Sequence, residues 1–279
     1  MTTRPFTKPL NTTSKDLLTE GLSVYLDINV DLGQARDQTF FESNDYELLN
    51  YVSSVNLPCC VHEGHPVQVE KLAARAKAAE CAVGAHIAYP DPKNAGYSHI
   101  DLDEDELAAW IRVQLGTLTA LIQPSRAELT HVRPHGALYD AILTKPEVAK
   151  VMAETMMAFN PWLVLVGPAG ESLERLKAET NVRTAPEVVL GRRYKSGLIP
   201  LTGLKDSDLE KQATLEQAQQ LLKNKNLTTQ DGKTQAVEYH TFHLRPGLPD
   251  VIEVAKTLNQ WIHHPVPLPV VAMGPSGWV

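Results

Sequence analysis

Seven short apolar segments, spaced along most of the chain, are the feature that most constrains its fold. They lie at about residues 24–29, 55–61, 81–85, 129–133, 162–166, 182–190 and 235–240. Amphipathic or helix-forming segments alternate with them, at about residues 42–53, 66–79, 103–122, 146–159, 170–179, 208–224 and 250–262. Strands that alternate with helices predict a parallel sheet covered by helices. Short apolar strands are expected where both faces of the sheet are covered.

Polar side chains or glycines follow nearly every one of these strands. The set is Asn29, Asp31, His62, His86, Arg133, His135, Gly167, Gly170, Arg192, His240 and His243. In parallel α/β folds the functional site forms beyond the carboxyl ends of the strands. An open sheet brings together only the strand ends near its switch point, whereas a closed ring brings together all of them. We therefore predict a single-domain, distorted β/α barrel of about seven parallel strands, with an open doubly wound sheet as the alternative.

Composition excludes several classes of protein. The chain has 279 residues, 43% of them hydrophobic, which suffices for a sizeable core and excludes a mainly disordered chain. Its formal net charge of −7 argues against a nucleic-acid partner. No apolar run has transmembrane length, and the N-terminus lacks the apolar stretch of a signal peptide. The three cysteines, an odd number, fit a reducing compartment. We expect a cytoplasmic protein with no membrane partner.

Three regions are expected along the chain. Residues 1–21, which contain Pro5 and Pro9, are predicted to form an N-terminal arm. Residues 22–262 carry the alternating pattern and should form the barrel domain. Residues 263–279 carry four prolines, so we expect a C-terminal tail without a regular helix or a central strand.

The first strand and the histidines after later strands are the candidate site. Val24, Leu26, Ile28 and Val30 share one face of that strand, and Asp27, Asn29 and Asp31 share the other. Buried carboxylates are costly unless they are hydrogen-bonded, ion-paired or bound to a metal. Taken singly, Asp31 is explained as a turn former and each histidine as a satisfied polar group. Neither His62 with His65 nor His131 with His135 forms a helical zinc pair, because glycine or proline intervenes. The segment Gly167–Gly170 before a helix suits an anion, but it lacks the lysine of a phosphate loop.

Several motifs occur together in one order along the chain. They are Asp27-Ile28-Asn29-Val30-Asp31-Leu32-Gly33, the Asn56–Gly64 segment with Leu57-Pro58-Cys59-Cys60-Val61-His62-Glu63, Val83-Gly84-Ala85-His86, His131-Val132-Arg133-Pro134-His135-Gly136, Leu163–Gly167, and Glu187-Val188 to Arg192-Arg193-Tyr194. In these motifs the chain resembles the LamB/YcsF (lactam utilisation) family over roughly residues 24–260. The family's members are the A-type subunit of the ATP-dependent 5-oxoprolinase. The resemblance implies a distorted barrel related to those of glycoside hydrolases and deacetylases.

The resemblance also implies an activity. That activity is hydrolysis of a cyclic amide C–N bond, the opening of 5-oxoproline (pyroglutamate) to glutamate with ATP and with B- and C-type partner subunits. We interpret Asp31, His62, His86 and His135 as candidate catalytic residues, for proton transfer or for holding a cation. Candidate substrate- or phosphate-binding residues are Asn29, Arg133, Arg192 and Tyr139. Whether a divalent metal takes part stays open, with Asp31, His62 and His86 as candidate ligands.

The chain departs from the usual family pattern at several site positions. Gln34 stands where glutamate is usual, His65 and Gly191 stand where aspartate is usual, and Arg133 stands where lysine is usual. The late His-Gly-Asp motif reads His243-Leu244-Arg245. A site that relied on those carboxylates would be impaired. Two alternatives therefore stay open: a divergent metal-dependent deacetylase or hydrolase, and a non-catalytic family member acting as a binding subunit.

Overall fold

The computed structural model describes residues 26–34, 44–201, 208–245 and 247–271. The expected N-terminal arm, residues 1–21, lies outside the described residues, as does the end of the expected tail. Within the described part of the chain, no helix is both long enough and apolar enough to cross a membrane.

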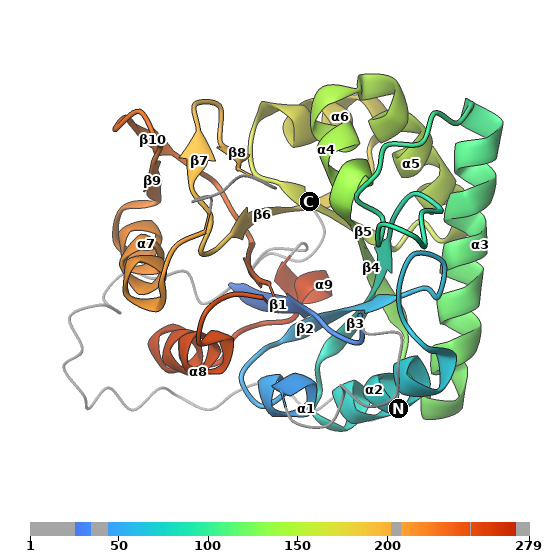
Figure 1. Ribbon diagram of the computed structural model, residues 1–279, viewed down its shortest axis with the longest axis horizontal. Coiled ribbons are helices and arrows are strands. Elements are labelled where there is room, and N and C mark those ends of the chain that lie inside the picture. The colour runs from blue at the N-terminus through green and yellow to red at the C-terminus, as the bar shows by residue number, and fades with distance from the viewer. Residues whose placement is uncertain (1–25, 35–43, 202–207, 246, 272–279) are drawn as a thin grey trace.

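Seven parallel strands close into a barrel, in the order β1-β11-β6-β5-β4-β3-β2 (Figure 1). They are β1 (Asp27–Asp31), β2 (Ser54–Pro58), β3 (Ala82–Ile87), β4 (Leu129–Pro134), β5 (Val164–Pro168), β6 (Arg183–Val189) and β11 (Thr241–Leu244). Closure comes from β1, which pairs with β2 on one side and with β11 on the other. The predicted seven-stranded barrel is thus confirmed over the open sheet.

Helices surround this barrel, with α2, α3 and α5 along one side and α7 and α8 along the other in Figure 1. Their bounds are α1 (Asn44–Leu48), α2 (Pro66–Ala78), α3 (Glu104–Ile122), α4 (Gly136–Thr144), α5 (Pro146–Phe159), α6 (Glu171–Thr180), α7 (Lys211–Asn224), α8 (Val251–Ile262), α9 (Leu268–Val271) and the 3-10 turn η1 (Gln123–Ser125). Local sequence explains the starts of two of them. Pro66 occupies the first turn of α2, and Asp103 and Glu106 form a capping box at α3.

The main hydrophobic core lies between the barrel wall and the helices. Ile28 and Val30 of β1 belong to it, as do Ile111, Leu115 and Leu118 of α3. The apolar face expected for the first strand therefore points outward, toward the helices. Its polar face points into the barrel, so both faces of β1 are buried.

The C-terminal tail closes the amino end of the barrel. The backbone N–H of Leu268 donates to Oγ of Ser54 at 3.1 Å, and that of Val266 donates to the Leu26 carbonyl at 2.9 Å. The Leu268 side chain is fully buried in a second apolar cluster with Val164, Val166 and Ala185. The prediction of a tail without a helix was wrong for residues 268–271, where a four-residue helix, α9, forms after Pro267.

The predicted position of the last barrel strand, residues 235–240, was also wrong. Residues 234–236 form β10 (Thr234–Ala236), which pairs antiparallel with β9 (Asn226–Thr228) outside the barrel. The seventh barrel strand is Thr241–Leu244, whose four side chains are all buried. Thr241 and His243 point into the barrel, so this strand lacks the continuous apolar pattern on which the prediction relied. A second small hairpin, β7 (Tyr194–Lys195) with β8 (Ile199–Pro200), follows β6.

Two helical predictions needed correction. Helix α4 was missed, because only Lys145 separates it from α5, which begins at Pro146, and because a Pro-His-Gly segment leads into it. The segment 42–53 is helical only over Asn44–Leu48 within its described residues. Helix α4 matters for the site, since it begins directly after His135.

Candidate active site

The inside of the barrel is lined with polar side chains, beginning with Asp27 at its amino end. The carboxylate of Asp27 accepts hydrogen bonds from the hydroxyls of Ser53 at 2.7 Å, Ser54 at 2.6 Å and Thr241 at 2.5 Å. Burial raises the pKa of Asp27 to about 7, against the opposing effect of these hydroxyls. These contacts tie β1, β2 and β11 together below the strand ends.

Asn29 forms the next layer, and its side-chain amide bonds to barrel neighbours. Its Nδ2 donates to Thr241 at 2.6 Å, and its Oδ1 accepts from Nδ2 of Asn56 at 2.8 Å and lies 2.6 Å from Nδ1 of His243. The predicted substrate-binding residue Asn29 thus orients Asn56 and His243. Above Gly84, the ring of His131 crosses the barrel and reaches Asn56 Oδ1 at 3.0 Å.

Asp31 lies at the carboxyl end of β1, where four side chains converge on its carboxylate. Nδ2 of Asn56 donates to it at 2.9 Å, and Nδ1 of His86 lies 3.0 Å away. Arg133 Nη1 and His243 Nε2 each lie 3.3 Å from its other oxygen. Burial opposes ionisation of Asp31, but Arg133, His243 and His86 outweigh it and hold the pKa well below its usual value. Asp31 is therefore a buried anion in a cationic and hydrogen-bonding cage.

Arg133 joins Asp31 to a second buried carboxylate, Glu187 of β6. Its Nε and Nη2 donate to the two oxygens of Glu187 at 2.9 and 2.8 Å, a bidentate pair. The ring centroid of Tyr139 lies 5.2 Å from the guanidinium carbon of Arg133. Burial disfavours the charge on Glu187, yet Arg133 keeps the pKa of Glu187 below its usual value. The predicted anion-binding Arg133 thus already binds two carboxylates of its own chain.

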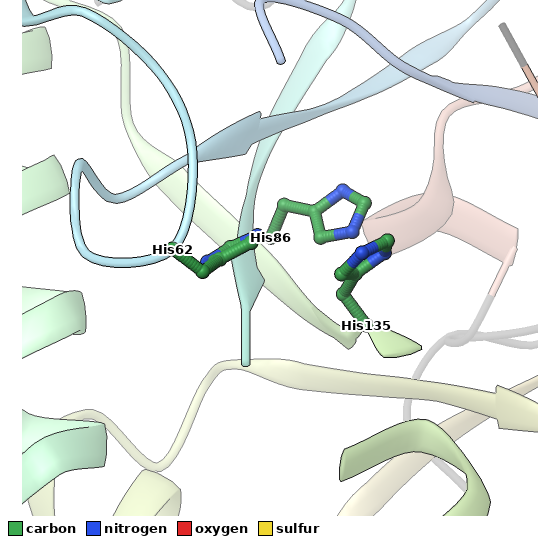
Figure 2. A group of neighbouring side chains, drawn as sticks. All are labelled: His62, His86 and His135. Atoms are coloured by element: carbon green, nitrogen blue, oxygen red, sulfur yellow. The ribbon is translucent and has the colours of Figure 1, made fainter. Parts of the chain in front are cut away.

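Three of the four predicted catalytic residues form a cluster of imidazoles above Asp31. His62 follows β2, His86 lies in β3, and His135 follows β4. The ring centroids are 4.5 to 5.6 Å apart, and one nitrogen from each ring lies within 4.8 Å of the others (Figure 2). Burial and the neighbouring His86 lower the pKa of His135 to about 3, so this ring is neutral at pH 7. Neutral imidazoles can accept protons or bind a cation.

The loop of residues 91–99, here called the roof loop, covers the histidine cluster. Asp91 holds it together, since its carboxylate accepts from the backbone N–H of Asn94 at 3.2 Å and of Ser98 at 2.9 Å. The Ala95 carbonyl accepts from Nε2 of His135 at 3.0 Å. The ring of Tyr97 packs edge-on against His135, with centroids 4.7 Å apart, while 66% of Tyr97 remains exposed. The roof loop therefore fixes His135 and places an accessible aromatic ring beside it.

Arg192 does not join this cluster. It pairs with Asp208, whose carboxylate also lies 3.0 Å from Nη2 of Arg245. Tyr97 lies within electrostatic range of both arginines as well as of Asp31. The two guanidinium groups therefore lie outside the histidine cluster, on the side of the barrel where the strands end.

One departure from the family pattern is built into the packing. Gly191 has φ of +75°, and a Cβ added there would lie 2.2 Å from Cδ1 of Leu248. The aspartate usual at this position would therefore require Leu248 to move. The site has nevertheless kept buried carboxylates, at Asp31 and Glu187.

Three site residues were named in the sequence but given no role in the site: Asn56 and Glu187 as members of motifs, and His243 as a residue that follows a strand. Glu187 carried a signal, because it is a lone charge within the apolar segment 182–190. His243 lies in the strand that was misplaced by the prediction. Asn56 is an ordinary polar residue in sequence, and only its position facing Asn29 and Asp31 shows its importance.

The fold and this site define a class: a parallel β/α-barrel protein whose strand ends gather buried carboxylates and histidines. The model of the LamB/YcsF family matches residues 26–266, and the chain belongs to that family. The A subunit of 5-oxoprolinase from Histophilus somni (strain 129Pt) is 31% identical over 240 residues, 84% of this chain and 94% of that protein. The corresponding A subunit from Bacillus thuringiensis subsp. konkukian (strain 97-27) is 28% identical over 242 residues, 86% of this chain and 95% of that protein.

A solved structure agrees with this assignment. The lactam utilization protein from Thermus thermophilus superposes with a TM-score of 0.78 at 29% identity. The match covers 87% of this chain and 99% of that chain. The barrel described above is therefore similar to that structure over almost its whole length.

Proposed function

We propose that this chain is the A-type subunit of a 5-oxoprolinase and opens the lactam ring of 5-oxoproline to give glutamate, with ATP and two partner subunits. The observation that carries the proposal is the contact of Asp31 with His86 directly beneath the cluster with His62 and His135. The relatives named as the A subunit of 5-oxoprolinase support it, since this chain spans 94% of the Histophilus somni protein.

The chemistry explains why such a site suits a lactam. An amide carbonyl is a poor electrophile, and phosphorylation of its oxygen makes the carbon reactive. Water then adds to that carbon, and the carbon–nitrogen bond breaks as the ring nitrogen takes up a proton, which leaves an acyl phosphate. A second water hydrolyses this acyl phosphate to the glutamate carboxylate and inorganic phosphate. The addition requires a group that takes a proton from water. The imidazole cluster supplies nitrogen bases for this role, and the anionic Asp31 stabilises positive charge that develops on His86.

We assign substrate binding to the region just outside the histidine cluster, beyond the carboxyl ends of the strands. Arg133 is saturated by Asp31 and Glu187, so we assign it the positioning of these carboxylates. Tyr97, Arg192 and Arg245 lie further out, and two guanidinium groups suit a carboxylate or a phosphate. Tyr139 lies beside Arg133 and supports its orientation.

ATP binding is assigned to the partner subunits. The Gly167–Gly170 segment between β5 and α6 lacks the lysine of a phosphate loop, and Gly167 and Pro168 belong to the barrel strand itself. The relatives are named as one lettered subunit of their enzyme, which implies that further subunits exist. We therefore propose that B- and C-type subunits supply the activated lactam to this barrel.

Reconstitution tests this function. The full chain is mixed with B- and C-type subunits, and ATP hydrolysis is measured with and without 5-oxoproline. We expect 5-oxoproline-dependent ATP hydrolysis that requires all three components. Asp31→Ala should abolish it, and His240→Ala, at the opposite end of the barrel, should retain it. ATP hydrolysis that never depends on 5-oxoproline, in any combination of subunits, would overturn the proposal.

A further inference from the structure

We propose that His62, His86 and His135 bind one divalent transition-metal ion, with Asp31 as the outer partner that orients His86. The three side chains come from the ends of three adjacent strands, and each offers one nitrogen within 4.8 Å of the others. Figure 2 shows the three rings gathered around one point. All three residues are buried, so an ion held there is shielded from bulk water.

The orientation of two rings supports this site. Nδ1 of His86 lies 3.0 Å from Oδ1 of Asp31, and Nε2 of His135 lies 3.0 Å from the Ala95 carbonyl. The Ala95 carbonyl can only accept, so Nε2 of His135 carries the proton in the neutral ring, and the nearby Asp31 carboxylate favours the proton on Nδ1 of His86. The lone pair is then on Nε2 of His86 and on Nδ1 of His135. Metal-binding histidines hold their second nitrogen in this way, against a carboxylate or a backbone carbonyl.

The distances between the ligand nitrogens fit one bound ion if the three imidazole rings move slightly closer together. Each Zn–N bond is about 2.1 Å, so nitrogens on one tetrahedral zinc lie about 3.4 Å apart. The nitrogens of the cluster lie within 4.8 Å of one another. Small side-chain rotations would bring the three nitrogens close enough together to bind one ion.

The surroundings of the cluster favour a cation. Asp31 and Glu187 are buried carboxylates, and Arg133 is the guanidinium that pairs with both of them. Two carboxylates against one guanidinium leave one negative charge in excess beside the histidines. A divalent ion at the cluster would offset that charge.

The roof loop holds the cluster in place from the other side. A Cβ added at Gly96 would lie 3.1 Å from Cδ2 of His135 and 3.4 Å from Cδ2 of His62. The N–H of Ala137 donates to the Gly96 carbonyl at 3.0 Å, which fastens the loop to the start of α4. The backbone of the roof loop therefore packs against His62 and His135, so an ion would bind to a largely preformed site.

The donor set indicates the kind of ion and its use. Imidazole ligands suit zinc and neighbouring first-row ions. Three protein ligands leave a fourth position for water, whose pKa the ion lowers. If the proposed lactam opening holds, an ion held there would acidify the attacking water and so replace proton removal by an imidazole; this role rests on the proposed function, whereas binding of the metal does not.

Metal titration tests the site directly. The full chain is treated with a chelator, dialysed and titrated by calorimetry with Zn²⁺ alone, and separately with Co²⁺ while its visible absorption is recorded. We expect one ion per chain and a Co²⁺ spectrum typical of nitrogen and oxygen ligands. His62→Gln, His86→Gln and His135→Gln should each weaken binding by about 100-fold or more. Asp31→Asn should weaken it about 10- to 100-fold, since it acts through His86.

The controls separate binding from folding and from activity. His240→Gln changes a half-buried histidine at the other end of the barrel and should leave Zn²⁺ affinity unchanged. Thermal melting of each variant without metal shows whether it folds. Absence of stoichiometric Zn²⁺ and Co²⁺ binding by the folded chain, or binding that survives all three histidine substitutions, would overturn the site. A chain that binds one zinc through these histidines but never acts on 5-oxoproline would contradict only the proposed function.

Discussion

Nδ1 of His86 lies 3.0 Å from Oδ1 of Asp31, and both residues are buried within the barrel. This contact joins the two parts of the site. Below it, Arg133 links Asp31 to Glu187, and above it, His86 packs against His62 and His135. A change at Asp31 should therefore affect both the stability of the barrel and the chemistry at the histidines.

The first prediction concerns the charge of Asp31. Asp31→Asn keeps the shape of the side chain but leaves Arg133 with only one carboxylate. Removing one partner of a buried ion pair costs about 3–5 kcal/mol, so we expect the free energy of unfolding in urea to fall by that order. Activity with 5-oxoproline should fall by about 100-fold or more. Asp105→Asn, on the exposed face of α3, should change stability by less than about 0.5 kcal/mol. Equal stabilities of the two variants would contradict the role of Asp31.

The second prediction concerns the two-sided pairing of Arg133. Arg133→Lys introduces the residue usual in the family, yet a lysine ammonium cannot hold Glu187 bidentately while it also reaches Asp31. We expect a loss of about 1–3 kcal/mol in the free energy of unfolding. The double variant Arg133→Lys with Glu187→Gln should lose less than the sum of its single variants, because the two residues share one interaction. Additive losses would show that the pair is not coupled.

The third prediction concerns Asp27 and pH. Its folded-state pKa is about 7, above the usual value of 3.8. The folded protein thus holds a proton that the unfolded chain releases, so this stabilisation is complete below the unfolded pKa and is lost as pH rises toward 7. Between pH 5 and 7 the stability of the native chain, compared with Asp27→Asn, should fall by about 2 kcal/mol. Urea unfolding at several pH values measures this difference, and a difference independent of pH would refute it.

The fourth prediction compares two glycines. Gly96 has φ of +80°, and a Cβ there would lie 2.7 Å from Cβ of Ala88. Gly96→Ala should therefore displace the roof loop, lower the melting temperature and weaken metal binding at His62 and His135. Gly116 lies in α3 with open space around it, and Gly116→Ala should stabilise the chain by about 0.5–1 kcal/mol. A Gly96→Ala chain with unchanged Zn²⁺ affinity would show that the roof loop does not support the cluster.

Much of the fold was predictable because buried parallel strands have a simple signature. The alternation of Asp27, Asn29 and Asp31 with Ile28 and Val30 correctly predicted a strand with one polar face. That face turned out to line the inside of the barrel. The convergence of His62, His86 and His135 followed from their shared position at or just beyond the carboxyl ends of strands β2, β3 and β4.

The rest depended on tertiary contacts that local patterns do not encode. The polar lining of β11 hid that strand, and Glu187 was overlooked because its partner Arg133 lies 54 residues away in the chain. Arg192 follows a strand, as expected, but an ion pair with Asp208 holds it away from the histidines. Asn29 is polar and close to the site, yet its hydrogen bonds are satisfied by Thr241, Asn56 and His243.

The most direct test of the central claim is the amount of glutamate formed from 5-oxoproline. The full chain is incubated with ATP and with B- and C-type subunits that are active with the A-type protein of Histophilus somni. We predict ATP-dependent glutamate formation by this chain and its loss in Asp31→Asn. If the Histophilus somni protein forms glutamate in the same mixture while the native chain forms none, the proposed function is contradicted.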